Sequence, residues 1–211
     1  LSIRRQRQMC IRDSLEDEVQ TRESAKLCVD LLGGLDIFVH LAAYVGTTKA
    51  AGWAVPFNEQ TVAAWDAALR VNLTSAFILV QETYQDLSKS GNGAVILFGS
   101  TYALSGQDLR LYEGTDMVNP SAYGASKAAL LQLTRHLATT FAPSIRVNSI
   151  SPGGVWRNQP ESFRSNYVAR APLGRMATEQ DLKGAVAFLA SDLSQYVTGH
   201  NLMVDGGWSA W

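Results

Sequence analysis

Hydrophobic residues along the chain alternate between a helical spacing and short apolar runs. From Thr21 to Leu32, apolar residues recur every three or four positions, which is typical of an amphipathic helix that ends at the following glycine pair. The next run, Leu35 to Ala43, is apolar over the length of one strand, as a strand buried on both faces requires. Residues 21–43 therefore predict a helix followed by a buried strand.

The same alternation continues along the rest of the chain. Further helices are predicted over 61–69, 73–87, 121–141 and 179–190, and further strands over 93–98, 145–150 and 201–204. This order predicts an α/β fold with a doubly wound parallel sheet that carries helices on both faces. The sequence shows no internal repeat and no low-complexity linker, so we expect residues 14–211 to form a single domain.

The first residues differ in composition from the rest. Residues 1–12 hold four arginines and no acid, so the remaining chain carries 14 basic and 19 acidic residues, a net charge of −5. No apolar stretch of a secretory signal follows them. The segment RQRQMCIRDS resembles translated adapter sequence, and we expect residues 1–13 to be a non-native or disordered arm; a genuine basic arm is the alternative.

Composition excludes several classes of protein. With 211 residues, 46% hydrophobic and 18% charged, the chain is too apolar for intrinsic disorder and long enough for a large core. Cys10 and Cys28 form no Cys-x-x-Cys pair, which predicts a cytoplasmic protein without a structural metal site. A net charge of −1 gives no reason to expect nucleic acid or a membrane as a partner, and the longest uncharged run, 90–107, contains four glycines.

The sharpest chemical signal is Tyr123-Gly-Ala-Ser-Lys127 near the start of a predicted helix. Two residues four apart lie on one helix face, so the ammonium can reach the phenol. An ammonium about 4 Å away contributes roughly 4 kcal/mol at an effective dielectric of 20, which would lower a phenol pKa of about 10 by about 3 units. The spacing predicts a proton-transfer tyrosine; an ordinary surface pair is the alternative.

Three further segments stand in a fixed order around this pair. Asn72 lies between two predicted helices, Ser100 follows the strand at 93–98, and a Pro-Gly-Gly-Val turn ends the strand at 145–150. In this order Asn72, Ser100, Tyr123 and Lys127 resemble the catalytic set of the short-chain dehydrogenases/reductases. The segments RVNL, IRVNSISPGGV and VTGHNLMVDGG resemble three further blocks of that family. The resemblance implies a Rossmann-like fold and an NAD- or NADP-dependent oxidoreductase that transfers hydride between a nicotinamide and a hydroxyl or keto group.

The resemblance also implies a role for each catalytic residue. Ser100 would orient the substrate, and Tyr123 would give or take the hydroxyl proton. Lys127 would hold the nicotinamide ribose and lower the Tyr123 pKa, and Asn72 would anchor a water molecule. Without the resemblance, Ser100 is a turn residue at a strand end and Asn72 is a helix cap.

Residues at the other strand ends would contact the cofactor. His40, Ala42 and Ala43 stand where the family usually has Asn-Asn-Ala-Gly, and a satisfied core histidine is the alternative for His40. The turn with Pro152, Gly153 and Val155 would present backbone groups to the nicotinamide, since glycine permits close approach. The cofactor-binding candidates are therefore His40, Ala42, Ala43, Tyr123, Lys127, Pro152, Gly153 and Val155.

The Gly-rich phosphate-binding loop of the family is missing from the sequence. No Gly-rich cluster precedes a helix before Leu35, although bare amides at a helix N-terminus hold the pyrophosphate in such folds. We therefore expect the first βαβ segment to be absent and the 211-residue chain by itself to be inactive. The residue that separates NAD from NADP would be missing too, so that choice stays open.

Two features bear on the substrate. Ser100 and Tyr123 are 23 residues apart, more than is usual for the family, and the turn after Val155 is rich in hydrogen-bond donors. Such donors suit a polyhydroxylated or anionic small molecule. The candidate substrate-contacting residues are Thr101, Tyr112, Trp156, Arg157 and Asn158. The segments LYEGT and RNQPE resemble family members that accompany bacterial flagellin glycosylation and nonulosonic-acid sugar pathways.

Alternatives remain within and outside this class. A 3-oxoacyl carrier-protein reductase or a general alcohol dehydrogenase is the alternative within the family, and a non-catalytic binding or assembly protein is the alternative on the same fold. The predicted helices 73–87 and 121–141 are apolar on more than one face. The resemblance implies that they meet their symmetry mates in a homodimer or homotetramer.

Overall fold

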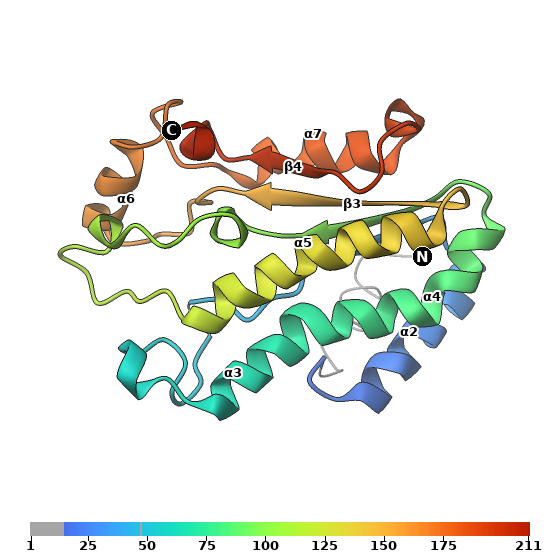
Figure 1. Cartoon of the computed structure of the whole chain (residues 1–211), viewed down its shortest axis with the longest axis horizontal. Helices are drawn as coiled ribbons and strands as arrows, with labels where there is room; N and C mark the ends of the chain where they lie inside the picture. The colour runs from blue at the N-terminus through green and yellow to red at the C-terminus, as the bar shows by residue number, and fades with distance from the viewer. Residues whose placement is uncertain (1–14, 47) are drawn as a thin grey trace.

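The computed structural model of the chain describes residues 15–46 and 48–211, and the expectation for residues 1–13 lies outside this range. Helices and strands alternate as the sequence predicts, and Figure 1 shows them as a layered molecule with the sheet between helices. In chain order the helices and strands are α2 (Glu18–Leu32), β1 (Ile37–His40), α3 (Val62–Leu69), α4 (Ser75–Lys89), β2 (Gly93–Phe98), α5 (Ser121–Phe141), β3 (Ile145–Pro152), α6 (Glu161–Val168), α7 (Glu179–Ala190) and β4 (Asn201–Val204).

Within the described residues, the sheet has four parallel strands in the order β1-β2-β3-β4. Helices α4 and α5 pack on one face and α7 packs on the other, while α2 packs on α4 (Figure 1). The predicted α/β fold with helices on both faces is confirmed. Because all four strands run in the same direction, their carboxyl ends meet at one edge of the sheet, where ligands bind in open parallel sheets.

The core lies on both sides of β2, whose six residues are all buried. Side chains of a strand alternate between the two faces. Val95 and Leu97 accordingly pack with the α4 and α5 side chains, and Ile96 and Phe98 pack with Leu189 of α7. This double burial explains why β2 is a continuous apolar run in the sequence.

Strand β1 differs from its prediction. It covers four residues rather than 35–43, and it is not buried on both faces, since Ile37 and Val39 are 43% and 38% exposed. The reason is the position of α7, which packs on β2, β3 and β4 and leaves this face of β1 exposed. The other face of the strand carries Phe38 and His40 and is covered by α4.

The predicted helices 61–69 and 73–87 form one continuous helical segment, Val62–Lys89, joined by a π-helical turn over Arg70–Thr74. By length and composition alone this segment could cross a membrane. In the structure α3 packs on α5, and α4 packs on α2, β1 and β2. We therefore interpret it as a structural helix of the domain. Helix α6 was not expected from the sequence.

Candidate active site

The catalytic candidates come together at the carboxyl edge of the sheet. Ser100 follows β2 directly and caps a short 3-10 helix, where its Oγ accepts a hydrogen bond from the Tyr102 amide. Tyr123 and Lys127 lie in the first two turns of α5, which starts after Pro120. The Ser100 side chain acts on the Tyr123 phenol, whose pKa it lowers against the effect of burial. The structure therefore places all three side chains around one site.

Lys127 is almost fully buried at this edge, with 2% of its surface exposed. Its Nζ donates a hydrogen bond to the carbonyl oxygen of Phe98, the last residue of β2, over 2.7 Å. The same nitrogen lies 5.9 Å from the centre of the Tyr123 ring. Burial disfavours the charged form and lowers the Lys127 pKa to about 8.

Asn72 lies in the π-helical turn and is fully buried. Its Oδ1 accepts a hydrogen bond from the Tyr44 amide, and its Nδ2 donates to Ser126 Oγ over 2.9 Å. Ser126 Oγ in turn donates to the Tyr123 carbonyl oxygen over 2.8 Å. Asn72 is thus connected to the backbone of α5 at the catalytic tyrosine candidate.

The expected lowering of the Tyr123 pKa is not found in this structure. Burial raises the pKa of the phenol, and the Ser100 side chain opposes that shift in part. The spacing along the helix does not account for burial, which removes water from the phenolate and so raises the pKa. It also placed the ammonium at the hydroxyl, whereas Lys127 lies beside the ring and bonds to Phe98. Tyr123 is accordingly a protonated phenol at neutral pH.

The cofactor candidates of β1 lie at the same edge. His40 is 2% exposed, and its Nε2 lies 3.0 Å from Ser75 Oγ. Its Nδ1 is buried and has no hydrogen-bond partner among the residues that the structure describes. Ala42 and Ala43 follow in the connection after β1 and are half-buried.

The turn at 152–155 follows β3 as predicted, and its two glycines pack against Tyr167 of α6. A Cβ at Gly153 would lie 2.6 Å from the Tyr167 hydroxyl, and one at Gly154 would lie 2.7 Å from the Tyr167 ring. The Tyr167 hydroxyl also accepts a hydrogen bond from the Gly154 amide over 2.7 Å. The glycines are therefore needed for the packing of α6, and close approach of a ligand is not required to explain them.

The substrate candidates divide into two groups. Thr101 and Tyr112 lie in the β2–α5 connection, where the Tyr112 and Tyr102 hydroxyls are 2.6 Å apart. Arg157 is exposed and forms an ion pair with Glu179 of α7. The other two residues of that turn are Trp156, whose ring lies under the Arg164 guanidinium, and Asn158, which has a positive φ of 59°.

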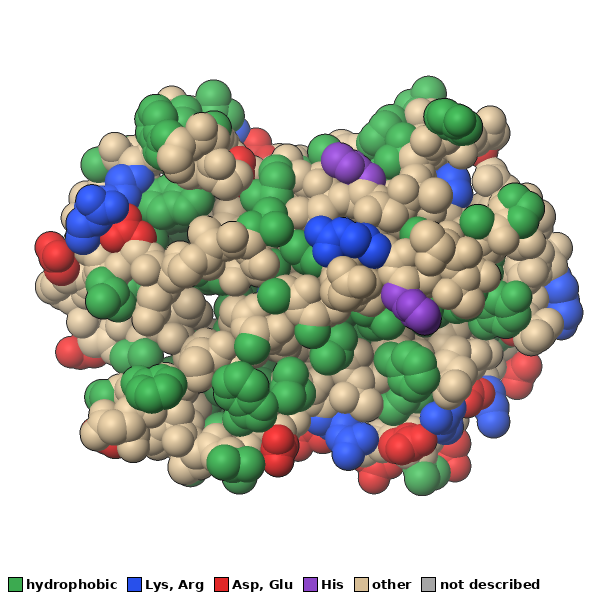
Figure 2. Space-filling view, in the orientation of Figure 1, with side chains coloured by type: hydrophobic (Ala, Val, Ile, Leu, Met, Phe, Trp, Pro, Cys, Tyr) green, Lys and Arg blue, Asp and Glu red, His purple; other side chains and the backbone are tan. Residues whose placement is uncertain are grey.

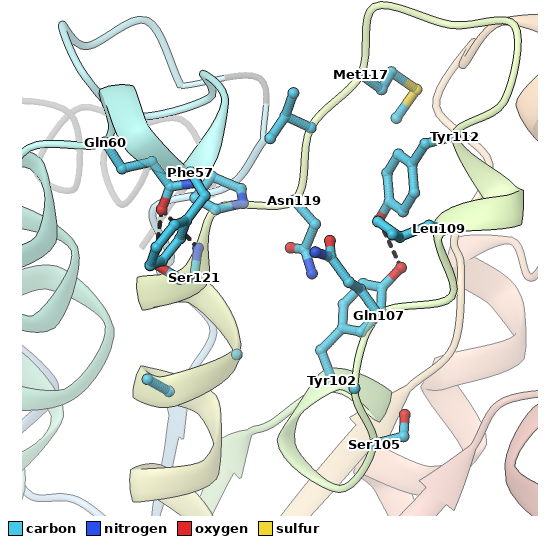
Figure 3. Close-up of a pocket in the computed structure, with 15 residues that line it drawn as sticks. Phe57, Gln60, Tyr102, Ser105, Gln107, Leu109, Tyr112, Met117, Asn119 and Ser121 are labelled. Carbon is cyan, nitrogen blue, oxygen red and sulfur yellow. Dashed lines mark hydrogen bonds between the residues drawn. The ribbon is translucent and has the colours of Figure 1, made fainter.

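A cavity of about 550 Å³ opens between the β2–α5 connection and the turn at Phe57–Glu59 (Figure 3). Tyr102 and Tyr112 lie on one side of it, and Asn119 and Gln107 lie near its middle. The cavity adjoins the catalytic candidates through Tyr102, whose ring meets that of Tyr123 edge-on with centroids 6.5 Å apart. Sequence analysis missed Tyr102, although its position two residues after Ser100 was a usable signal.

The residues present fit a nicotinamide cofactor. A lysine ammonium has three N–H donors, and Phe98 is the one acceptor the structure gives Lys127 among the described residues. The other two N–H donors of Lys127 lie at the sheet edge where such folds bind dinucleotides. The same edge carries the Nδ1 atom of His40, which has no partner among the described residues, and the small side chains of Ala42 and Ala43. The Ser100 and Tyr123 hydroxyls lie at the same edge, so a dinucleotide bound there would adjoin two hydroxyl groups.

Comparison with known proteins gives the family. Residues 5–209 match the family described as Enoyl-(Acyl carrier protein) reductase. The cis-4-hydroxycyclohexanecarboxylate dehydrogenase of Sinomonas cyclohexanicum is 32% identical over 97% of this chain and 78% of its own length. The chain belongs to the short-chain dehydrogenase/reductase family, whose members use NAD or NADP, and it is an oxidoreductase.

Solved structures agree with this assignment. A short-chain dehydrogenase from Leptospira borgpetersenii with bound NAD+ superposes with a TM-score of 0.83 and 35% identity, covering 94% of this chain and 74% of that one. A gluconate 5-dehydrogenase from Burkholderia cenocepacia in complex with NADP and tartrate has a TM-score of 0.80 and 25% identity, covering 93% of this chain and 73% of that one. The two cofactors match the expectation of either NAD or NADP.

The burial of His40 predicts a loss of stability in acid. Burial and the positive charge of Lys127, the one charged group that acts on it, lower the His40 pKa from 6.5 to about 4. The unfolded chain therefore takes up this proton first as the pH falls. The contribution of neutral His40 to the free energy of unfolding is fully present above pH 6.5 and is lost as the pH falls from 6.5 to 4. The pKa difference of about 2.5 units corresponds to about 3 kcal/mol.

Urea unfolding at a series of pH values should show this loss in the wild type and not in His40→Gln. The exposed His136→Gln is the control, and an equal acid loss in His40→Gln would contradict the assignment.

The burial of the Lys127 ammonium predicts that removing its charge makes the protein more stable than the wild type. Because its folded pKa of about 8 lies below the unfolded value of 10.5, the full penalty is present below pH 8 and disappears as the pH rises toward 10.5. Lys127→Met removes a penalty of about 3 kcal/mol and one hydrogen bond worth about 1 kcal/mol. We expect a net gain of about 2 kcal/mol at pH 7 in urea unfolding without cofactor. The exposed Lys183→Met should change nothing, and a destabilised Lys127→Met would refute this account.

Proposed function

We propose that the protein reduces a keto group, or oxidises the matching hydroxyl group, of a small polyhydroxylated substrate with Tyr123 as the acid-base residue. The observation that supports this most is the grouping of the Ser100 and Tyr123 side chains beside the buried Lys127 ammonium. A bound nicotinamide supplies or accepts the hydride. Lys127 and His40 would hold it, with Ala42, Ala43 and the Pro152, Gly153 and Val155 turn around it.

The protein's own residues then control one proton and one oxygen atom. Ser100 holds the substrate oxygen by a hydrogen bond, and Tyr123 gives that oxygen a proton during reduction or removes it during oxidation. Burial keeps the Tyr123 phenol protonated, which suits the donor role. Lys127, with a pKa of about 8, can exchange protons near neutral pH, and Asn72 holds α5 through Ser126.

The cavity favours an uncharged substrate over an anionic one. No Lys or Arg of the described chain lines it; its polar groups are amides and hydroxyls, including those of Gln107, Asn119 and Tyr112. Arg110, in the connection that lines the cavity, and Arg170 both form ion pairs with Asp108. A substrate carboxylate would lose water there without gaining a cation, which is unfavourable. A neutral polyol or ketose gains hydrogen bonds instead.

Three finer parts of the proposal have separate support, two from the sequence and one from the surface of the structure. The LYEGT and RNQPE segments support a sugar-derived substrate of the kind used in bacterial flagellin glycosylation. The pattern of cysteines supports a cytoplasmic enzyme. A homodimer or homotetramer is supported by an apolar groove between α4 and α5 that includes Phe77, which is 46% exposed, and Leu133. Figure 2 shows hydrophobic side chains on this face.

The acid-base role is tested by Tyr123→Phe. In the enzyme expressed from its full gene, we expect nicotinamide-dependent turnover to fall about a thousandfold, within the range that acid-base catalysis contributes. The measurement is the absorbance of reduced nicotinamide at 340 nm with a polyol and either NAD+ or NADP+. Tyr196→Phe changes a fully exposed tyrosine and should keep full activity. Wild-type turnover in Tyr123→Phe would exclude the proposed function.

The substrate class is tested with a matched neutral and acidic pair such as glucitol and gluconate. We expect kcat/KM to favour the neutral member by about tenfold or more, because an unpaired carboxylate in the cavity is desolvated. Gln107→Arg should shift the ratio toward the acid, while Gln195→Arg adds the same charge at an exposed position away from the cavity. A wild-type preference for the acid would contradict the neutral cavity.

A further inference from the structure

The π-helical turn between α3 and α4 changes which donor reaches which carbonyl. The Ser75 amide donates to Arg70, five residues back, instead of to Val71, four residues back, where an α-helix would place it. Ser75 Oγ donates to the Val71 carbonyl oxygen instead, over 2.6 Å. The side chain of Ser75 thus takes the place that its own amide would occupy in an α-helix.

This assignment fixes the protonation of His40. The Ser75 hydroxyl has one proton, and the Val71 carbonyl can only accept, so that proton lies between them. The oxygen of Ser75 therefore offers a lone pair to His40 Nε2, which is 3.0 Å away and must carry a hydrogen. The imidazole is then the Nε2–H tautomer with a bare Nδ1 atom.

The surroundings of His40 keep the ring neutral. His40 pairs in register with Leu97, and the next residue of β2, Phe98, holds the Lys127 ammonium through its carbonyl group. A second proton on the ring would place an imidazolium ion close to that buried ammonium. The positive charge of Lys127 acts against it, and so does the burial of the ring.

We propose that His40 and Ser75 are positioning residues that stabilise the π-helical turn and so aim the Asn72 side chain at Ser126 of α5. Asn72 lies in the middle of this turn, and its side-chain amide bonds with the Tyr44 amide and with Ser126 Oγ. The importance of His40 and Ser75 for the reaction rests on the proposed function, in which Asn72 belongs to the catalytic set. The hydrogen-bond chain from His40 to Ser75 to Val71 connects the end of β1 to that turn.

Without the Ser75 hydroxyl, the two ways of bonding this turn compete. The Val71 carbonyl then lacks its hydroxyl donor, and the α-helical pattern supplies one by moving the Ser75 amide back to it. Successive residues of a helix differ by about 100° in direction, so a change of one residue in the bonding pattern turns Asn72 away from Ser126. Loss of the His40 donor should also weaken the turn, because it leaves the lone pair of the buried Ser75 oxygen without a hydrogen-bond donor.

The tautomer is measured first, in the unaltered protein. Nitrogen–proton correlation spectra of the imidazole rings should show His40 at pH 7 with a hydrogen on Nε2 and none on Nδ1. His136 and His200 are exposed and serve as internal controls for the titration. A hydrogen on Nδ1, or a charged ring at pH 7, overturns the proposal without any variant.

The positioning role is measured through the side-chain amide of Asn72, assigned by its absence in Asn72→Asp. In Ser75→Ala and in His40→Leu, hydrogen exchange at this amide should become about tenfold faster, as expected for the loss of one hydrogen bond. His40→Gln keeps an N–H donor near the Nε2 position and should restore the slow exchange.

Thr83→Val is the matched control. Thr83 is a buried residue of the same helix whose Oγ1 also bonds to a carbonyl four residues back, that of Leu79, over 2.8 Å. Its removal should leave the Asn72 amide unchanged. An unchanged Asn72 amide in Ser75→Ala refutes the positioning role, whether or not overall stability falls. None of these measurements needs turnover, so their failure is distinct from a failure of the Tyr123→Phe test.

Discussion

The burial of the Lys127 ammonium is the constraint on which the site depends. A charge removed from water is unfavourable unless polar groups surround it. Here the Phe98 carbonyl at the end of β2 provides one such group over 2.7 Å. That bond ties the second turn of α5 to the carboxyl edge of the sheet. It thereby brings Tyr123 on the helix close to Ser100 at the strand end, whose side chain lowers the pKa of the phenol against the effect of burial.

The remaining polar groups of the site support this arrangement from two sides. Asn72 reaches α5 through Ser126, and His40 reaches the same helical layer from β1 through Ser75. Each group has a specific partner, because a buried polar atom without one is unfavourable. The exceptions among the described residues include His40 Nδ1, which lies at the expected cofactor edge. Buried charges and unpartnered polar atoms lower the free energy of unfolding, and this loss of stability is the cost of a site that needs such groups.

Hydrophobic periodicity predicted the order of the elements, and the resemblance to a known family supplied the four catalytic candidates. The carboxyl ends of parallel strands meet at one edge, which is why Ser100 and the cofactor candidates of β1 lie together. It did not predict the π-helical turn, which depends on the hydroxyl of Ser75 competing with a backbone amide. The predicted shift of the Tyr123 pKa had the wrong direction. Spacing indicates how near a charge lies, but the burial that raises the pKa depends on the folded chain. The contact of Gly153 and Gly154 with Tyr167 could not be predicted either, because Tyr167 lies 13 positions after Gly154 and meets it only in the folded chain.

The most direct test of the account is the pKa of the Lys127 ammonium, followed by NMR of isotopically labelled lysine side chains in the protein without cofactor. Lys26, Lys49, Lys89 and Lys183 are exposed, and their signals serve as references in the same spectra. One signal should titrate near 8 and be absent from Lys127→Met. If every lysine titrates above 10, the ammonium is not buried at the end of β2, and the site as described does not exist.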